Sequence, residues 1–160
     1  WTNVSWSDAH PRTDDIFEVF RRWEKAREQS WLSEEQKKAL QDPYQEHILL
    51  LNENNALELQ PYFRITLLPT FKIRAFHFQR KDKLYVVYWH TGGEGRCLLP
   101  LAREHVRVFD SLGAEPRTLR TQQGEVVIPA GSRRYMECTG LTQQQLIEAF
   151  RNLRLLNQNR

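Results

Sequence analysis

The region 47–138 consists of short segments rich in β-branched and aromatic residues, separated by turns. The turn at 80–83 is polar, and the turn at 91–95 contains three glycines. Strands this short, at regular spacing, favour antiparallel sheets over parallel βαβ units. The sequence therefore predicts a mainly antiparallel β-sandwich over residues 47–140.

Ten segments of this region are expected to be strands. They are 47–52, 56–60, 62–67, 71–79, 84–90, 96–101, 106–110, 116–120, 125–128 and 134–138. The first two flank Glu53, Asn54 and Asn55, and asparagine tolerates left-handed backbone angles. These two strands are therefore expected to form a hairpin.

Two helices are expected before the strands. Thr13 is a plausible N-cap for a helix over 13–29, whose apolar residues recur every three or four positions. They are Ile16, Val19, Phe20, Trp23 and Ala26. Ser33 and Gln36 form a capping box that opens a shorter helix, which ends before Pro43.

A third helix is expected at 142–155, where Thr142 and Gln145 form another capping box. Its apolar stripe contains Leu146, Ile147, Phe150 and Leu153. The fold class is therefore α+β, with N-terminal helices, a mainly antiparallel β-sandwich and a C-terminal helix. The expected divisions are a helical segment at 1–46, the sandwich at 47–140, and the helix and tail at 141–160.

The charge pattern and the hydropathy argue against a nucleic-acid-binding surface and against a membrane span. The net charge is +3, but basic and acidic residues alternate along the chain, so neither a nucleic-acid patch nor a basic tail is expected. The longest apolar stretches, 48–51 and 84–89, are far shorter than the roughly 20 residues that cross a bilayer. No membrane span is expected. The chain begins with Trp1 rather than Met, which we interpret as processing or truncation.

The chain contains no self-sufficient catalytic motif. The glycine cluster at 92–95 leads into a strand, whereas a phosphate-binding loop leads into a helix, so a hairpin turn is the better interpretation. The carboxylate pairs at 14–15 and 34–35 lie in first helical turns, where a structural role suffices. No catalytic residue, cofactor or metal site is expected.

Two of the five histidines could form a pair. His77 and His90 lie in or beside the strands that flank the 80–83 turn, so they could approach each other across a hairpin. Such a pair could bind a metal or relay protons. No carboxylate accompanies them at a defined spacing, which favours ordinary surface or hairpin-edge histidines.

The two cysteines lie in expected strands. Cys97 and Cys138 could form a disulfide or remain two buried thiols, and the sequence leaves both alternatives open. No CxxC motif or His/Cys pair has the spacing of metal ligands.

Exposed aromatic rings are the candidate ligand contacts. Tyr85, Tyr88 and Trp89 alternate imperfectly with valines, so one ring could face outward and stack on a sugar, although core packing is the default. Trp1 and Trp6 lie in a segment without periodicity and are the better candidates for substrate binding.

The order of the strand sequences resembles a known accessory domain. The relevant segments are 86–90, 98–101, 106–113, 126–129 and 133–136. Across about residues 71–140 they resemble the small C-terminal β-sandwich that follows the (β/α)8 barrel in many glycoside hydrolases. One strand of those domains reads hydrophobic-x-Asp-x-x-Gly, as at 108–113. The helix expected at 142–155 departs from that pattern.

The resemblance implies a role for the N-terminal part as well. Residues 1–12 would be the end of the last barrel strand and 13–29 the last barrel helix, with Trp1 or Trp6 lining the sugar site. The catalytic carboxylates would lie on strands outside these 160 residues. The chain would be a non-catalytic C-terminal portion whose partners are the remainder of a larger polypeptide, or another chain, and carbohydrate. A periplasmic or secreted location would then be favoured.

Two alternatives from other classes remain. One is a stand-alone β-sandwich module that binds carbohydrate or protein, and the other is a structural domain without a ligand.

Overall fold

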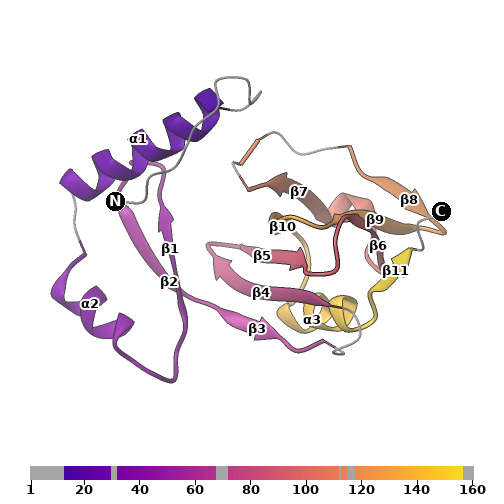
Figure 1. Cartoon of the computed structure of the whole chain (residues 1–160). Coiled ribbons are helices and arrows are strands. Elements are labelled where there is room, and N and C mark those ends of the chain that lie inside the picture. The colour runs from indigo at the N-terminus through magenta and orange to yellow at the C-terminus, as the bar shows by residue number, and fades with distance from the viewer. Residues whose placement is uncertain (1–12, 30–31, 68–71, 112, 115–117, 157–160) are drawn as a thin grey trace. The chain divides into compact units, whose positions relative to one another are not determined.

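The computed structural model describes residues 13–29, 32–67, 72–111, 113–114 and 118–156 (Figure 1). It is an α+β fold with a mainly β body, as the sequence predicted. Contacts divide the chain into two compact units, Trp1–Gln60 and Pro61–Arg160. Each unit is described by itself.

Unit 1 contains the two expected helices. Helix α1 spans Thr13–Gln29, with Asp14 and Asp15 in its first turn, where the helix dipole favours negative charge. Helix α2 spans Glu34–Leu40, and its capping box is formed: the hydroxyl of Ser33 accepts a hydrogen bond from the backbone N–H of Gln36 at 3.1 Å. Both helices lie where the sequence predicted them, and the capping box of α2 is confirmed; Thr13, the expected N-cap of the first helix, is the first residue of α1.

The expected hairpin of unit 1 is also present. Strands β1 (His47–Leu51) and β2 (Leu57–Pro61) form a two-stranded sheet. The side chain of Asn52 accepts backbone hydrogen bonds from Asn54 and Ala56 at 2.9 and 3.0 Å, and Asn55 has a φ of 56°. Asparagine thus supplies both the local acceptor and the left-handed residue of this turn.

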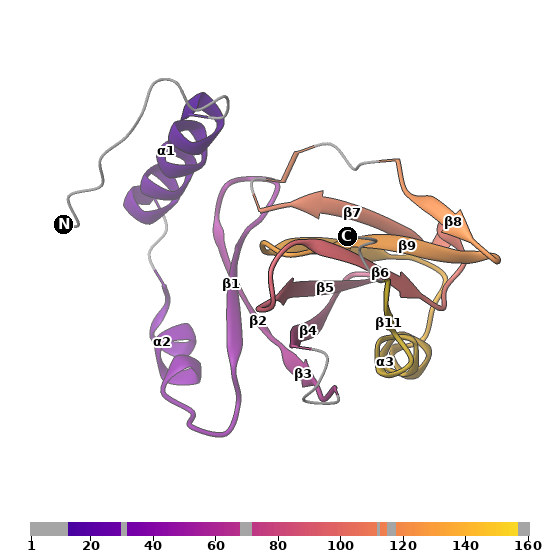
Figure 2. The same cartoon turned by 45° about the vertical axis from the view of Figure 1, so that its right-hand side comes forward.

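Unit 2 contains two antiparallel sheets built from the described residues (Figure 2). In spatial order, the first holds β3 (Phe63–Ile65), β4 (Ile73–Arg80), β5 (Lys83–His90), β10 (Arg134–Cys138) and β7 (Val106–Asp110). The second holds β11 (Arg154–Leu156), β6 (Gly95–Leu99), β9 (Glu125–Ala130) and β8 (Arg120–Gln122).

The chain passes repeatedly from one sheet to the other. It leaves the first sheet after β5, returns to it through the short 3-10 helix Arg103–His105, and crosses again after β7, β9 and β10. Each crossing brings residues distant in sequence onto facing sheets. Their inner faces supply most of a single buried cluster, which burial of apolar area stabilises.

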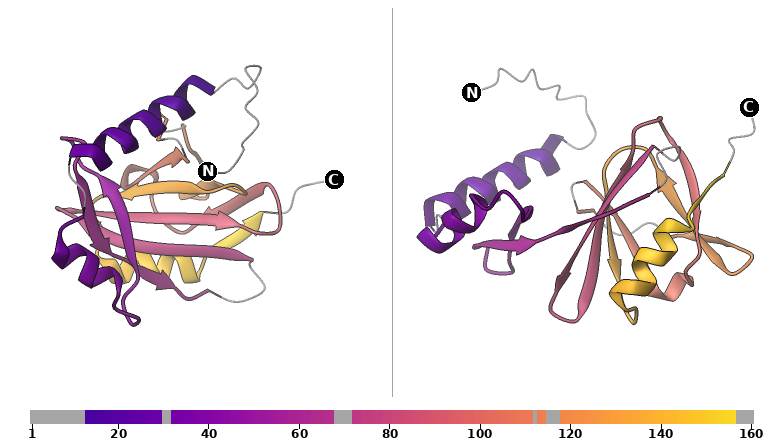
Figure 3. Two further views of the ribbon diagram at one scale, coloured as in Figure 1. Left: turned by 60° about the vertical axis from the view of Figure 1, so that its left-hand side comes forward. Right: turned by 90° about the horizontal axis from the view of Figure 1, so that it is seen from below.

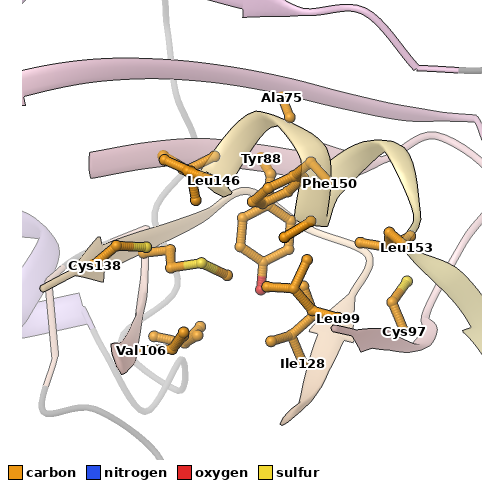
Figure 4. Close-up of a cluster of buried hydrophobic side chains, with 14 of the residues drawn as sticks. Ala75, Tyr88, Cys97, Leu99, Val106, Ile128, Cys138, Leu146, Phe150 and Leu153 are labelled. Atoms are coloured by element: carbon orange, nitrogen blue, oxygen red, sulfur yellow. The ribbon is translucent and has the colours of Figure 1, made fainter. Parts of the chain in front are cut away.

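The middle of this cluster is the ring of Tyr88, which is 2% exposed (Figure 4). Its hydroxyl donates a hydrogen bond to the carbonyl oxygen of Pro129 on β9, at 3.0 Å, and so links the two sheets. Phe150 of the C-terminal helix meets this ring edge-on, with 6.1 Å between ring centroids. Packing between the sheets therefore includes a helix.

That helix, α3, spans Gln143–Arg151 and begins with the predicted capping box of Thr142 and Gln145. It ends at Arg151, so the expected helix over 142–155 is too long by its last turn. Residues 154–156 instead form β11, which pairs with Arg96, Cys97 and Leu98 of β6. The free edge of β6 offers backbone hydrogen-bond partners that helical periodicity cannot reveal.

Helix α3 lies between β3 and β11, the edge strands of the two sheets (Figures 2 and 3). Leu146, Ala149, Phe150 and Leu153 on and just after it are buried in the common cluster.

A further difference concerns the strand expected at 116–120: the structure has β8 at Arg120–Gln122, and residues 115–117 lie outside the described part.

The cysteines are two buried free thiols. Figure 4 shows Cys97 and Cys138 on opposite sides of the Tyr88 ring, so the disulfide alternative is excluded. Burial in apolar surroundings raises the pKa of each thiol to about 12.

Candidate functional site

The structure describes some of the candidate site residues named from the sequence and not others. Trp1 and Trp6 lie outside the described residues. His77 and His90 do not form a pair, because His90 lies opposite Ile73 and His77 lies opposite Val86. They are therefore separated by four residues along the ladder, or roughly 13 Å. Strand register, which the sequence does not show, keeps them apart.

Each histidine has local partners of its own. His77 is buried beside the ring of Phe63, and its Nε2 lies 3.5 Å from the side-chain amide of Gln143 at the start of α3. Burial lowers the pKa of His77, which favours the neutral imidazole. Nδ1 of His90 donates to the carbonyl oxygen of Gly93 at 2.7 Å, within the β5–β6 turn.

The three aromatic residues of β5 point to opposite faces of the sheet. Tyr88 points into the core, whereas Tyr85 and Trp89 lie on the other face of the five-stranded sheet and are partly exposed. Cross-strand register continues this outer face from β4 to β7, because Phe76 pairs with Val87, Val87 with Tyr135, and Tyr135 with Phe109. We call these outer-face residues the aromatic face: Phe76, Phe78, Tyr85, Val87, Trp89, Phe109 and Tyr135. Phe78 and Val87 are buried, and the other five are partly exposed.

Rings on the aromatic face stack on one another across the strands. The centroids of Phe76 and Trp89 are 5.6 Å apart at 19°, and those of Phe78 and Tyr85 are 5.3 Å apart at 13°. Tyr62 meets Phe76 edge-on at 5.1 Å. Such contacts hold the rings in fixed positions and add stability beyond area burial.

Arginines lie over several of these rings. The guanidinium carbon of Arg64 is 5.6 Å from the ring centroid of Phe76, and that of Arg107 is 5.2 Å from the ring of Phe109. Arg133, in the turn before β10, lies 6.0 Å from the ring of Trp89. These distances are those of cation–π pairs, so the face combines aromatic and cationic character.

Glu137 of β10 balances part of that charge. Its carboxylate accepts from the hydroxyl of Tyr85 at 3.2 Å and forms ion pairs with Lys83 at 3.2 Å and Arg107 at 3.3 Å. Burial, followed by the negative charge of Glu137, raises the pKa of Tyr85. Three such partners give this carboxylate a structural role, which is enough to explain its presence on the strand.

At one end of the aromatic face, two turns form a shallow pocket of about 480 Å³, which we call the Trp89 pocket. It is lined by Trp89, His90, Gly93, Glu94, Gly131, Ser132 and Arg133. The turns are joined directly: the backbone N–H of Ser132 donates to the carboxylate of Glu94 at 3.2 Å, and the N–H of His90 donates to the carbonyl oxygen of Gly131 at 2.9 Å.

Two glycines make this close packing feasible. Gly131 has a φ of 136°, and a Cβ there would collide with the Glu94 carboxylate. A Cβ on Gly92 would lie 2.8 Å from the imidazole of His90. Side chains at either position would displace a pocket residue. The absence of side chains at these two positions therefore leaves room for Glu94 and His90.

The residues of this site are suited to binding. Among the described residues, no group of three or more His, Cys, Asp or Glu side chains could hold a metal ion. Within the same part of the chain, no helix is long and apolar enough to cross a membrane. The pocket offers a flat ring, a guanidinium, an imidazole and a carboxylate, which together can recognise a polar ligand.

Trp89 is one of the three rings that the sequence offered as possible outward-facing aromatics, whereas the pocket residues Glu94, Ser132 and Arg133 were not predicted. The two turns are 36 or more residues apart in sequence, and only the pairing of β9 with β6 and of β10 with β5 brings them together. The available signals were the isolated Gly131 and the glycine cluster at 92–95. Comparison of the chain with models of known protein families and with curated proteins finds no match.

Proposed function

We propose that this chain is the C-terminal, non-catalytic portion of a glycoside hydrolase-like protein, in which the β domain supports a (β/α)8 barrel. The observation that carries the proposal is the aromatic face. Tyr, Trp, Phe and Arg are the residue types enriched at the centres of protein interfaces. Here they lie in rows across four adjacent strands, fixed by stacking before any partner arrives.

Helix α1 supports the same proposal. Ile16, Val19 and Trp23 are partly buried, whereas Phe17 and Phe20 are 38% and 51% exposed. Apolar side chains thus extend over more of the helix surface than one narrow stripe. This distribution suits a helix with more than one packing partner, as the outer helices of a barrel have.

A stand-alone β-sandwich module that binds carbohydrate or protein is the second candidate. The observation that favours it is the Trp89 pocket, where a ring and several polar groups converge in turns at one end of the sheets. Binding residues are commonly presented on loops by a rigid scaffold of strands.

The parent reading frame tests the first proposal. About 300 upstream residues with alternating strand and helix patterns are expected, and the longer protein should hydrolyse glycosides. A start codon immediately before Trp1 would contradict the proposal.

A paired substitution tests the role of the aromatic face. Tyr135→Thr removes one ring but keeps β propensity, so it should lower the melting temperature of the longer protein more than that of the 160-residue chain. Gln122→Thr on exposed β8 is the control and should change neither. Equal shifts for Tyr135→Thr in both proteins would show that the face supports no further domain.

A further inference from the structure

The Trp89 pocket is a preformed site, because its side chains are held before a ligand enters. The carboxylate of Glu94 is fixed by the N–H of Ser132, and the imidazole of His90 by the carbonyl of Gly93. Arg133 is placed over the indole of Trp89. Preorganisation of this kind reduces the entropy that a ligand must overcome on binding.

Positive charge gathers around this pocket. Arg74 is the cross-strand partner of Trp89 and is exposed. Lys72 lies against the β5–β6 turn, where its carbonyl accepts from the N–H of Thr91 at 2.8 Å and its side chain approaches Gly92. Of these three cations, Arg133 lines the pocket itself, and the pocket's carboxylate, Glu94, already accepts a backbone hydrogen bond. The guanidinium of Arg133 can therefore pair with an anionic group of a ligand.

The pocket also presents the partly exposed indole of Trp89 beside Arg133. A simple inorganic anion would use the cations but not the indole, and a neutral sugar would use the indole but not the cations. A ring that carries a carboxylate uses both, because its C–H face packs on an aromatic ring and its carboxylate pairs bidentately with a guanidinium.

We propose that the Trp89 pocket binds a uronic acid residue of an acidic carbohydrate. The carboxylate of the sugar would pair with Arg133, and the sugar ring would pack beside Trp89. The carboxylate of Glu94 would accept hydrogen bonds from the sugar hydroxyls, and the imidazole of His90 would accept from or donate to them. The proposal stands on the pocket alone and holds whether or not a barrel precedes the chain.

Single-stranded nucleic acid also combines rings with anionic groups, but its binding proteins provide a basic groove that follows several phosphates. Arg133 is the cation that lines this pocket of about 480 Å³, and Glu137 forms ion pairs with Lys83 and Arg107, which lie at the other end of β5 and on β7. The site therefore fits one anionic ring better than an extended strand.

Isothermal titration of the 160-residue chain with tetragalacturonate tests the proposal. Saturable binding is expected, with an affinity that falls as salt is raised because the pairing is ionic. Cellotetraose, a neutral tetrasaccharide, should bind at least about tenfold more weakly, which corresponds to roughly 1.4 kcal/mol. Equal affinity for the two sugars, or tighter binding of an oligothymidylate of four nucleotides, would overturn the proposal.

Matched variants locate the binding. Arg133→Gln should weaken tetragalacturonate binding at least about tenfold by removing the bidentate partner. Arg120→Gln makes the same charge change on exposed β8 and should leave binding unaltered. Both arginines are exposed, so each variant should keep the melting temperature of the parent chain. Absence of saturable binding, or equal effects of the two substitutions, would refute the assignment without bearing on the barrel.

Discussion

Replacing Phe150 by alanine tests whether α3 belongs to the core. Phe150 is fully buried, and its ring meets Tyr88 edge-on at the centre of the cluster (Figure 4). Truncating a buried Phe to Ala typically costs about 3–5 kcal/mol, because transfer free energy is lost and a cavity remains. About 0.5–1.5 kcal/mol of this reflects the edge-to-face pair. We expect a loss at the upper end, because sheets on both sides limit collapse of the cavity.

Urea denaturation followed by far-UV circular dichroism measures the loss. A domain of about 100 residues loses roughly 4–8 °C of melting temperature per kcal/mol, so Phe150→Ala should lower the melting temperature by at least about 12 °C. Gln144→Ala is the control, because Gln144 is exposed on the same helix and its replacement should change stability by less than about 0.5 kcal/mol.

A milder variant tests the hydrogen bond that links the two sheets. Tyr88→Phe retains the ring and removes the hydroxyl that donates to Pro129, so it should cost about 1 kcal/mol. A loss below about 1 kcal/mol for Phe150→Ala, with an unchanged denaturant slope, would refute the placement of α3 in the core.

Three further predictions concern titratable and reactive groups. Because the pKa of His77 lies below its unfolded value of about 6.5, the unfolded chain binds more protons at acid pH, so stability should fall as pH drops below 6.5. Urea titrations at pH 7.5 and 5.5 should show a smaller fall for His77→Gln, and an equal fall would contradict this role. Glu137→Gln should lower stability by about 1 kcal/mol in the same assay, because two of its three partners, Lys83 and Arg107, are partly exposed cations that water can solvate. Cys97 and Cys138, with pKa values raised to about 12, should not react with a disulfide reagent at pH 8 until urea unfolds the chain, and rapid labelling of the native chain would show that they are accessible.

Features that depend on neighbouring residues were predictable from the sequence. The capping boxes at Ser33 and Thr142 and the Asn55 turn formed as expected, because each requires only hydrogen bonds or backbone angles within a few residues. Most of the strands between 47 and 138 were predicted for the same reason, from their composition and turns.

Features that depend on strand pairing were not predictable. β11 exists because β6 has an edge to which it can pair, and His77 and His90 are separated because of register. The Trp89 pocket likewise requires Glu94 and Ser132 to meet across two sheets. None of these partners is specified by local periodicity, so a single sequence predicted the strands without predicting their arrangement.

The pairing of β11 with β6 also constrains when this domain can fold during synthesis. The core residues of α3 and the edge strand β11 are translated after all the other strands of unit 2. While residues 141–156 are still inside the ribosome, the apolar residues against which α3 packs remain exposed. At that stage β9 is the neighbouring strand of β6 among the described residues. Domains generally fold as units, and partly completed ones expose aggregation-prone surfaces. A nascent chain stalled before residue 141 should therefore remain sensitive to protease and bind chaperones, whereas one whose residue 156 has left the exit tunnel should become resistant.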